Sequence, residues 1–104
     1  MKPRLLLIGF LFVFASAAAD GDAVFESRCA ACHGSDGKGN PTIGTPDFTS
    51  PKTQSDISDA AIVDTVTNGR KGTIMPSWKG KLSDEEIAAV AAYVRSLGRK
   101  SQRR

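Results

Sequence analysis

The feature that most constrains this chain is the position of its few cysteine and histidine residues. Both cysteines and the only histidine lie in one run, Cys29-Ala30-Ala31-Cys32-His33. A C-x-x-C-H run is the attachment signature of c-type haem. Two thiols on such a tight turn can reach the vinyl groups on one edge of a porphyrin and form thioethers. The motif therefore predicts one haem c, bound covalently through Cys29 and Cys32, with His33 as an axial iron ligand.

Three other uses of these residues compete with haem attachment. A disulfide between Cys29 and Cys32 would close so short a loop that it restrains little entropy. A thioredoxin-type redox pair needs a βαβ context, which the sequence does not show. A structural zinc site needs four ligands, usually cysteine and histidine, and the chain has two cysteines and one histidine. Haem attachment is therefore the favoured interpretation.

Residues 1–19 have the features of a secretory signal peptide. Basic residues precede an apolar run over 5–15, and small residues follow it. The run is too short for a membrane-spanning helix, which needs about 20 residues, so an uncleaved anchor is the weaker interpretation. We expect cleavage after Ala19, with Ala17 as the second choice, and a bacterial protein exported to the periplasm.

After this leader, the chain has little from which to build a hydrophobic core. Many of its apolar residues are alanines, and its only aromatic residues are Phe25, Phe48, Trp78 and Tyr93. A chain of this size with so few large side chains makes a marginal core and often needs a staple. We expect the haem to fill the centre of a single domain over residues 20–98.

The domain is predicted to be all-α, because no strand-like alternation is long enough to build a sheet. A first helix is expected over 22–31, with Asp22 as its N-cap. A second helix is expected to begin after Ser58 and to end at 68–69. Loops rich in glycine and proline separate these helices from each other and from the last one.

The last helix is the clearest element. Ser83 and Glu86 are spaced as a capping box. Gly98 is placed to end the helix. Between these points apolar residues recur at helical spacing, at Ile87, Val90, Ala91, Val94 and Leu97.

The second axial ligand is predicted to be Met75, the only methionine after the leader. It lies in a loop between two expected helices, and Pro76 restricts the backbone directly after it. A lone methionine is commonly core filler. Beside a haem motif, however, a thioether opposite an imidazole is the ligation that suits electron transfer. We therefore expect His33 and Met75 to ligate the iron from opposite sides.

The chain after the leader resembles the small monohaem class I cytochromes c over nearly its whole length. The residues that carry the resemblance are Gly21, Phe25, the C-A-A-C-H run with Gly34 after it, Met75-Pro76 and Tyr93. The resemblance implies the cytochrome c fold, in which three to four short helices and Gly- and Pro-rich loops surround one covalently bound haem. In that family the first and last helices cross, so Gly21 and Phe25 should contact the last helix. The contacts expected there are Val90 and Tyr93.

The resemblance also implies contacts around the haem. A proline carbonyl should accept the Nδ1 proton of His33, with Pro46 best placed and Pro41 second. Such a bond would orient the imidazole and raise its basicity. Further candidates, as donors to the haem propionates, are Trp78, Arg70 and Lys71. The equal alternative is that these three are a packed indole and two solvated charges.

An apolar pocket is expected to keep water from the iron and to tune its potential. Its candidate residues are Phe25, Ile43, Phe48, Ile74, Leu82, Val90 and Val94. We expect outer-sphere transfer of single electrons, with weak docking of partners at the exposed haem edge near 29–31. The alternatives are a haem-based ligand sensor, which needs an open sixth site, and an electron-entry module of a larger oxidoreductase complex. No catalytic constellation is seen, so an enzyme is not expected.

The expected partners are other redox proteins, namely a membrane oxidase or reductase or a periplasmic dehydrogenase. Residues 99–104 form a basic tail, which is either a solvated helix end or a contact to an anionic surface. Nucleic acid is not expected, because the chain is exported and the basic cluster has no interleaved aromatic residues. We expect a monomer.

Overall fold

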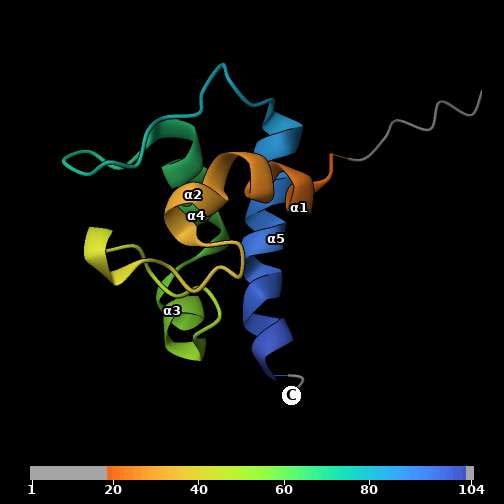
Figure 1. Ribbon diagram of the computed structural model, residues 1–104. Coiled ribbons are helices and arrows are strands. Elements are labelled where there is room, and N and C mark those ends of the chain that lie inside the picture. Colours follow the sequence, from red (N-terminus) through yellow and green to blue (C-terminus); the bar gives the residue numbers. More distant parts are fainter. Residues whose placement is uncertain (1–18, 103–104) are drawn as a thin grey trace, which may run out of the picture.

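The computed structural model describes residues 19–102, which form helices joined by loops (Figure 1). Within this range no strand occurs beyond an isolated bridge between Lys79 and Leu82. The all-α prediction is therefore confirmed. Residues 1–18 of the predicted signal peptide and residues 103–104 of the basic tail lie outside the described range. Among the described residues, no helix is both long enough and apolar enough to cross a membrane.

The first helical segment changes its pitch along its length. It consists of α1 (Gly21–Val24), the π-helical η1 (Phe25–Cys29) and α2 (Ala30–His33). The sequence predicts a helix here but not the π-helical part. A single π-helical turn is a local insertion into an α-helix, and such turns are frequent at functional sites. Here it ends at the first cysteine of the C-x-x-C-H motif.

The N-cap of this segment is Asp20, so the prediction of Asp22 was wrong by two residues. The Asp20 carboxylate accepts hydrogen bonds from the backbone N–H groups of Asp22 and Ala23, at 3.1 and 3.3 Å. Asp20 also has the extended backbone that an N-cap requires, with φ −87° and ψ 102°. Asp22 instead lies in the first turn, where its charge suits the helix dipole.

One short element lies in segment 34–51, which the sequence predicts as loop, and another begins where that segment ends. η2 is a 3-10 turn over Pro41–Ile43, and α3 is a helix over Pro51–Asp56. Ser50 caps α3, and a proline takes the first helical position, where its missing N–H costs nothing. With only six residues, α3 is too short to show a periodic apolar pattern, so the sequence does not predict it.

α4 (Asp59–Asn68) begins and ends as predicted. The Ser58 hydroxyl accepts a hydrogen bond from the backbone N–H of Ala61 at 3.0 Å. Gly69 ends the helix with a φ of 73°, which favours glycine.

α5 (Asp84–Gln102) begins at the predicted capping box. Ser83 N–H donates to Glu86 Oε1 at 3.0 Å, and Glu86 N–H donates to Ser83 Oγ at 3.1 Å. The predicted end at Gly98 was wrong, because the helix continues to its end at residue 102. Gly98 is buried, and a Cβ there would lie 2.5 Å from Gln54 Cγ. The lack of a side chain at Gly98 therefore serves packing against α3 and does not end the helix.

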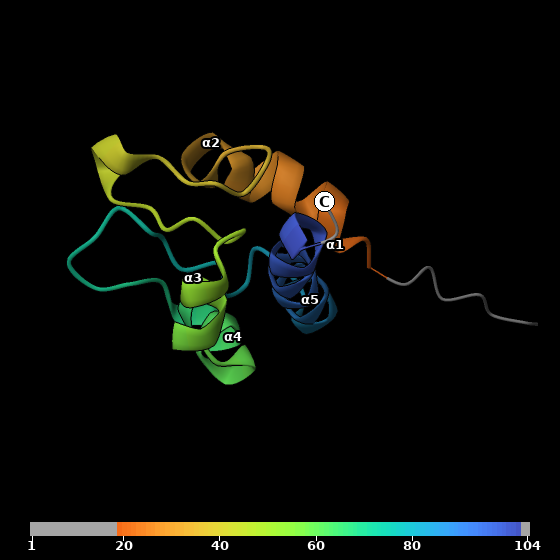
Figure 2. The same cartoon turned by 90° about the horizontal axis from the view of Figure 1, so that it is seen from below.

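The long helix α5 runs along one side of the domain, where α1 crosses it and α3 and α4 lie beside it (Figure 1, Figure 2). The expected contact of the first helix is confirmed at Tyr93, whose ring lies 5.2 Å from that of Phe25. A Cβ at Gly21 would lie only 2.2 Å from the Ala89 carbonyl oxygen, so the crossing requires glycine there. The buried core comprises Val24, Phe25, Ile62, Val66, Leu82, Ile87, Val90, Ala91, Val94 and Leu97.

Two long loops extend on the same side of α5 (Figure 2). Loop 34–50 connects α2 to α3 and includes η2, and loop 69–83 connects α4 to α5. The first loop lies next to His33 along the chain, and the second carries Met75. The predicted iron ligands therefore come from a helix end and from a loop.

Candidate haem site

The two thiols of the motif lie at the join of η1 and α2. Cys29 ends η1, Cys32 lies in α2, and both are half-buried and not joined in a disulfide. Burial, with the neighbouring Cys32 as the smaller cause, raises the pKa of the Cys29 thiol to about 11. Cys29 is therefore protonated at neutral pH, and the disulfide alternative is not realised in this structure.

His33 ends α2, and its imidazole is set up to be neutral. Burial lowers the pKa of His33 below its ordinary value. A neutral imidazole is the form that binds a metal ion. Nδ1 is buried without a hydrogen-bond partner, and no other buried side-chain nitrogen or oxygen is in this state among residues 19–100. Such an orphaned polar group is costly unless a ligand or a rearrangement satisfies it.

Aromatic rings hold the imidazole from two directions. The ring of Phe48 stacks on His33, with centroids 5.0 Å apart and an angle of 24° between the planes. The ring of Phe25 is tilted by 45° at a centroid distance of 6.4 Å. The sequence places both phenylalanines in the apolar pocket but does not predict that Phe48 stacks on the imidazole, because the two residues are far apart along the chain.

The predicted hydrogen bond from His33 Nδ1 to the Pro46 carbonyl is not formed in this structure, nor is one to Pro41. The Pro46 carbonyl oxygen lies instead against Gly39, only 2.5 Å from where a Cβ would be. Gly39 N–H in turn donates to the His33 carbonyl at 2.8 Å. The loop is thus tied to the backbone of the motif and not to the imidazole nitrogen.

Met75 is half-buried and packs against the hydrophobic core. Its carbonyl accepts a hydrogen bond from Arg70 N–H at 3.1 Å. It also lies 2.9 Å from the position of a Cβ at Gly69, so glycine there lets the Met75 backbone approach the end of α4. Loop 69–83 thus brings the Met75 side chain to the core, although it lies far from the C-x-x-C-H motif in the sequence.

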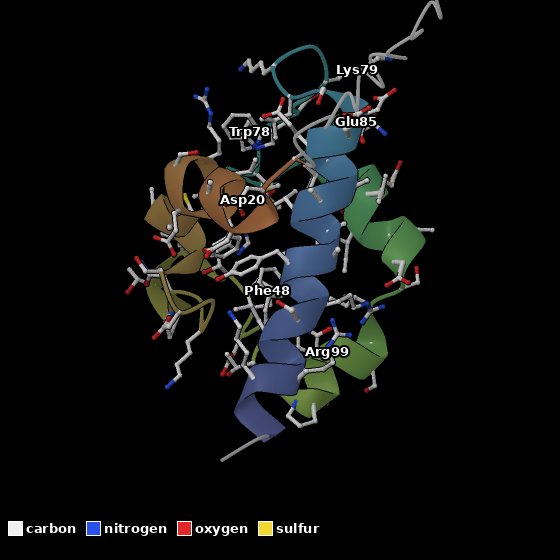
Figure 3. The ribbon with its side chains drawn as sticks, turned by 90° about the vertical axis from the view of Figure 1, so that its right-hand side faces the viewer. Asp20, Phe48, Trp78, Lys79, Glu85 and Arg99 are labelled. Carbon is white, nitrogen blue, oxygen red and sulfur yellow. The ribbon has the colours of Figure 1, made fainter. Side chains whose placement is uncertain are left out.

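The three candidate propionate donors lie in or beside this loop. Trp78 is half-buried, and the cations of Arg28 and Lys81 lie over its ring at 5.9 and 5.8 Å from the centroid. Arg70 and Lys71 are exposed. In Figure 3 Trp78 lies near the end of α5 where that helix begins, well away from Phe48. The role of these three residues as propionate donors stays a prediction.

The predicted apolar pocket divides into buried and exposed parts. Four of its residues are buried in the core: Phe25, Leu82, Val90 and Val94. Phe48 packs against that core and is half-buried. Ile43 is 40% exposed and Ile74 is 65% exposed, one in each of the two long loops.

These residues fit a covalently bound haem. The donor set is two free thiols, one neutral imidazole with an unpartnered buried nitrogen, and one thioether in a loop on the same side of α5. Imidazole and thioether are the axial ligand pair of electron-transfer cytochromes. The set does not resemble a zinc site, and among the described residues no cluster of three or more potential metal ligands of the His, Cys, Asp and Glu type occurs.

The helical fold and this donor set define a monohaem c-type cytochrome domain. More particularly, the chain belongs to the family described as "Cytochrome C oxidase, cbb3-type, subunit III", whose model matches residues 16–94. Cytochrome c domains typically serve as electron carriers, which agrees with the prediction of electron transfer.

Curated relatives support the same family. The chain is 44% identical over 81 residues to the cbb3-type cytochrome c oxidase subunit FixP of Bradyrhizobium sp. (strain ORS 278), covering 78% of this chain and 28% of that protein. It is 39% identical over 84 residues to the cbb3-type cytochrome c oxidase subunit CcoP of Cereibacter sphaeroides, covering 81% and 29%. The chain thus spans less than a third of the length of these relatives.

Solved structures agree with the fold. The KustC0563 c-type cytochrome superposes with a TM-score of 0.69 at 30% identity, covering 75% of this chain and 96% of that one. The c-type cytochrome NirC superposes with a TM-score of 0.61 at 25% identity, covering 73% and 85%. The predicted fold class is therefore confirmed.

Proposed function

We propose that this chain carries single electrons through one haem c, held by Cys29 and Cys32, with His33 and Met75 as the axial iron ligands. The observation that carries the proposal is the folded C-x-x-C-H run: two half-buried cysteines, not joined in a disulfide, lie at the join of η1 and α2, and His33 follows Cys32 directly with its pKa lowered by burial. Membership of a family of cytochrome domains supports it.

In this mechanism the haem supplies the reversible one-electron chemistry of its iron. Cys29 and Cys32 would hold the haem covalently through thioethers. His33, whose neutral form is favoured by burial, would hold the iron through a ring nitrogen. Phe25 and Phe48 keep the imidazole in place and exclude water on its side. His33 and Met75 would stay bound to the iron in both oxidation states, so little would have to reorganise during electron transfer.

Met75 is the part of the proposal that can be tested most simply. Met75→Leu keeps the side-chain volume but removes the thioether sulfur. The reduced variant should bind carbon monoxide, whereas the wild type should not. Ile74→Leu is the matched control, since Ile74 is the exposed neighbour of Met75 in the same loop. Equal behaviour of both variants and the wild type would remove Met75 from the iron.

We place the protein in the periplasm, with residues 1–19 as its signal peptide and a cbb3-type oxidase complex as its redox partner. The named relatives are subunits of such oxidases, which supports this partner. The experiment is to mix the reduced, haem-loaded protein with purified cbb3-type oxidase and follow its oxidation. The control is the same protein mixed with oxygen without the oxidase. Equal rates of oxidation with and without the oxidase would exclude the oxidase as partner.

The basic tail over 99–104 is proposed as an electrostatic contact to that partner. Arg99 and Lys100 are exposed, and the Lys100 ammonium lies 5.0 Å from the centre of the Tyr93 ring. Attraction between exposed charges is screened by salt. Deletion of 99–104 should therefore slow electron exchange at low salt only. Unchanged exchange rates at low salt would leave the tail as a solvated helix end.

A further inference from the structure

The ring that stacks on His33 is not held by the core alone. Phe48 lies in the loop before α3 and is only half-buried. Its backbone is fixed at both polar groups: its N–H donates to the Gly37 carbonyl at 2.8 Å, and its carbonyl accepts from Gln54 Nε2 at 2.7 Å. The place of the Phe48 ring against the imidazole therefore depends on where Gln54 lies.

Gln54 uses every polar group of its side chain. Besides the bond to Phe48, Nε2 donates to the Val94 carbonyl of α5 at 2.9 Å. Oε1 accepts from Arg95 Nη1 at 3.0 Å. Since both the nitrogen and the oxygen of the amide are hydrogen-bonded, its orientation is fixed. This one amide links loop 34–50 to α5.

At Gly98, α5 leaves space for the Gln54 side chain. A Cβ at Gly98 would lie 2.5 Å from Gln54 Cγ and 3.0 Å from Gln54 Cδ. Any other residue at this position would displace Gln54. Gly98, which the sequence predicts as a helix end, is thus the residue against which the Gln54 side chain packs.

Arg95 fixes the backbone that carries Gln54. Its Nη1 donates to the Gln54 carbonyl at 2.6 Å, and its Nη2 donates to the Ile57 carbonyl. It also pairs with Asp59, but that carboxylate is 84% exposed, and a pair so open to solvent contributes little. The contacts to the two carbonyls are what hold the end of α3 against α5.

The imidazole meets this arrangement at the Phe48 ring. A metal-bound histidine is normally oriented by a hydrogen bond from its second nitrogen. The stacked ring of Phe48 also restricts the imidazole plane, and at a centroid distance of 5.0 Å it lies nearer to His33 than the ring of Phe25 at 6.4 Å. Groups that orient a metal-binding histidine from outside also tune the metal, and the burial and contacts around the ligands are among the factors that set a haem potential.

We propose that Gln54 is a positioning residue for the iron ligand His33, acting through the backbone of Phe48 from a seat built by Arg95 and Gly98. The inference rests on the proposed role of His33 as an axial ligand. Gln54 does not contact the imidazole itself. It fixes the position of the Phe48 ring, which stacks on the imidazole.

The test compares haem-loaded wild type with Gln54→Glu, Phe48→Leu and the double variant. Gln54→Glu keeps the shape and the acceptor for Arg95 but loses both donated hydrogen bonds. The readouts are the paramagnetically shifted proton NMR signals of the His33 ring and the reduction potential. Lys52→Ala is the control, because it removes an exposed ion pair from the same helix. Gly98→Ala serves as a milder variant, since it displaces Gln54 without removing any hydrogen-bonding atom.

Gln54→Glu should shift the His33 signals and the potential beyond anything seen in Lys52→Ala, and Gly98→Ala should give a smaller shift in the same direction. In the Phe48→Leu background, Gln54→Glu should cause no further shift, because the route through the stacked ring is already lost. A lower melting temperature with unchanged signals and potential would overturn the inference, as would additive shifts in the double variant. The wild-type spectrum separates the two proposals: without a histidine-ligated, low-spin haem, the proposed function fails first and the inference with it.

Discussion

The two loops beside α5 differ in how firmly they are tied to the rest of the protein. Loop 34–50, on the His33 side, is bonded to the motif itself. Gly39 N–H donates to the His33 carbonyl at 2.8 Å, and the Thr45 hydroxyl donates to the Cys32 carbonyl at 3.0 Å. Further along, the Phe48 carbonyl is held by a side chain that also bonds to α5.

Loop 69–83, on the Met75 side, is attached to α4 mainly after the methionine. The Ser77 hydroxyl donates to the Thr67 carbonyl at 2.6 Å, and Trp78 N–H donates to the Val66 carbonyl at 3.0 Å. The part before Met75 is exposed and bonded chiefly within itself, as the Thr73 and Arg70 contacts show.

The difference shows that His33 is held by more contacts with the rest of the protein than Met75 is. The place of His33 is built into a helix end, two aromatic rings and a loop bonded to the motif. Met75 relies on its own loop and on the close approach at Gly69. We therefore expect perturbations near loop 34–50 to lower the stability of the whole domain, and perturbations near loop 69–83 to release the sixth ligand first.

The largest effect should come from losing both thioether attachments, which would remove the support of both loops at once. Cys29→Ala with Cys32→Ala should yield a protein without covalent haem and with most of its far-UV circular dichroism helix signal lost. The physical reason is that the chain has few large side chains from which to build a core. Ser27→Ala, on the same helical segment, is the control. A haem-free protein that melts cooperatively with full helix content would contradict this account.

On the His33 side, two glycines make a matched pair. Gly39 and Gly44 both have positive φ, 81° and 73°, so alanine should cost each about 1 kcal/mol of backbone strain. Only at Gly39 would the Cβ also collide, at 2.5 Å from the Pro46 carbonyl oxygen; at Gly44 nothing lies within 4 Å. Gly39→Ala should therefore lose roughly 1–3 kcal/mol more than Gly44→Ala in chemical denaturation. Equal losses would mean that this loop is not held as tightly as described.

On the Met75 side, Gly69 and Gly72 form the corresponding pair, with φ of 73° and 81°. A Cβ at Gly69 would lie 2.9 Å from the Met75 carbonyl oxygen, whereas nothing lies within 4 Å at Gly72. Gly69→Ala should let carbon monoxide bind the reduced protein, and Gly72→Ala should not. The measurement is a carbon monoxide titration followed by absorption. If Gly39→Ala opened the sixth site more than Gly69→Ala, the comparison of the two loops would be reversed.

The smallest effect concerns the crossing of α1 and α5. Burial, and then the negative charges of Asp22 and Glu26, raise the pKa of the Tyr93 phenol. The folded protein thus keeps this proton where the unfolded chain, with an ordinary pKa of 10.0, releases it. The stability is complete below pH 10 and is lost as the pH rises through the raised pKa. The melting temperature should fall more steeply above pH 10 in the wild type than in Tyr93→Phe; parallel curves would refute this.

Local signals in the sequence predicted much of the fold. The caps at Ser58 and at Ser83 with Glu86 are short-range patterns, and the structure confirms both. The contact of the first helix with Tyr93 came from family resemblance and is also confirmed. These features depend either on a few neighbouring residues or on a fold shared with many relatives.

The features that the sequence did not predict depend on distant contacts. Glycine often ends a helix, but Gly98 lies within α5, where it packs against Gln54. The bonds of Gln54 and Arg95 join residues about 40 positions apart, as with Gln54 and Val94. The hydrogen bond expected at His33 Nδ1 depends on where a loop carbonyl points, which no local pattern specifies.

The most direct test of the account is the absorption spectrum of the purified protein, made in cells that attach c-type haem, in its oxidised and reduced forms. The account predicts haem that stays with the chain under denaturing conditions, sharp α and β bands on reduction, and no change when carbon monoxide is added. Haem lost on denaturation would contradict attachment through Cys29 and Cys32. A high-spin spectrum that shifts with carbon monoxide would remove Met75 from the iron and favour a ligand sensor over an electron carrier.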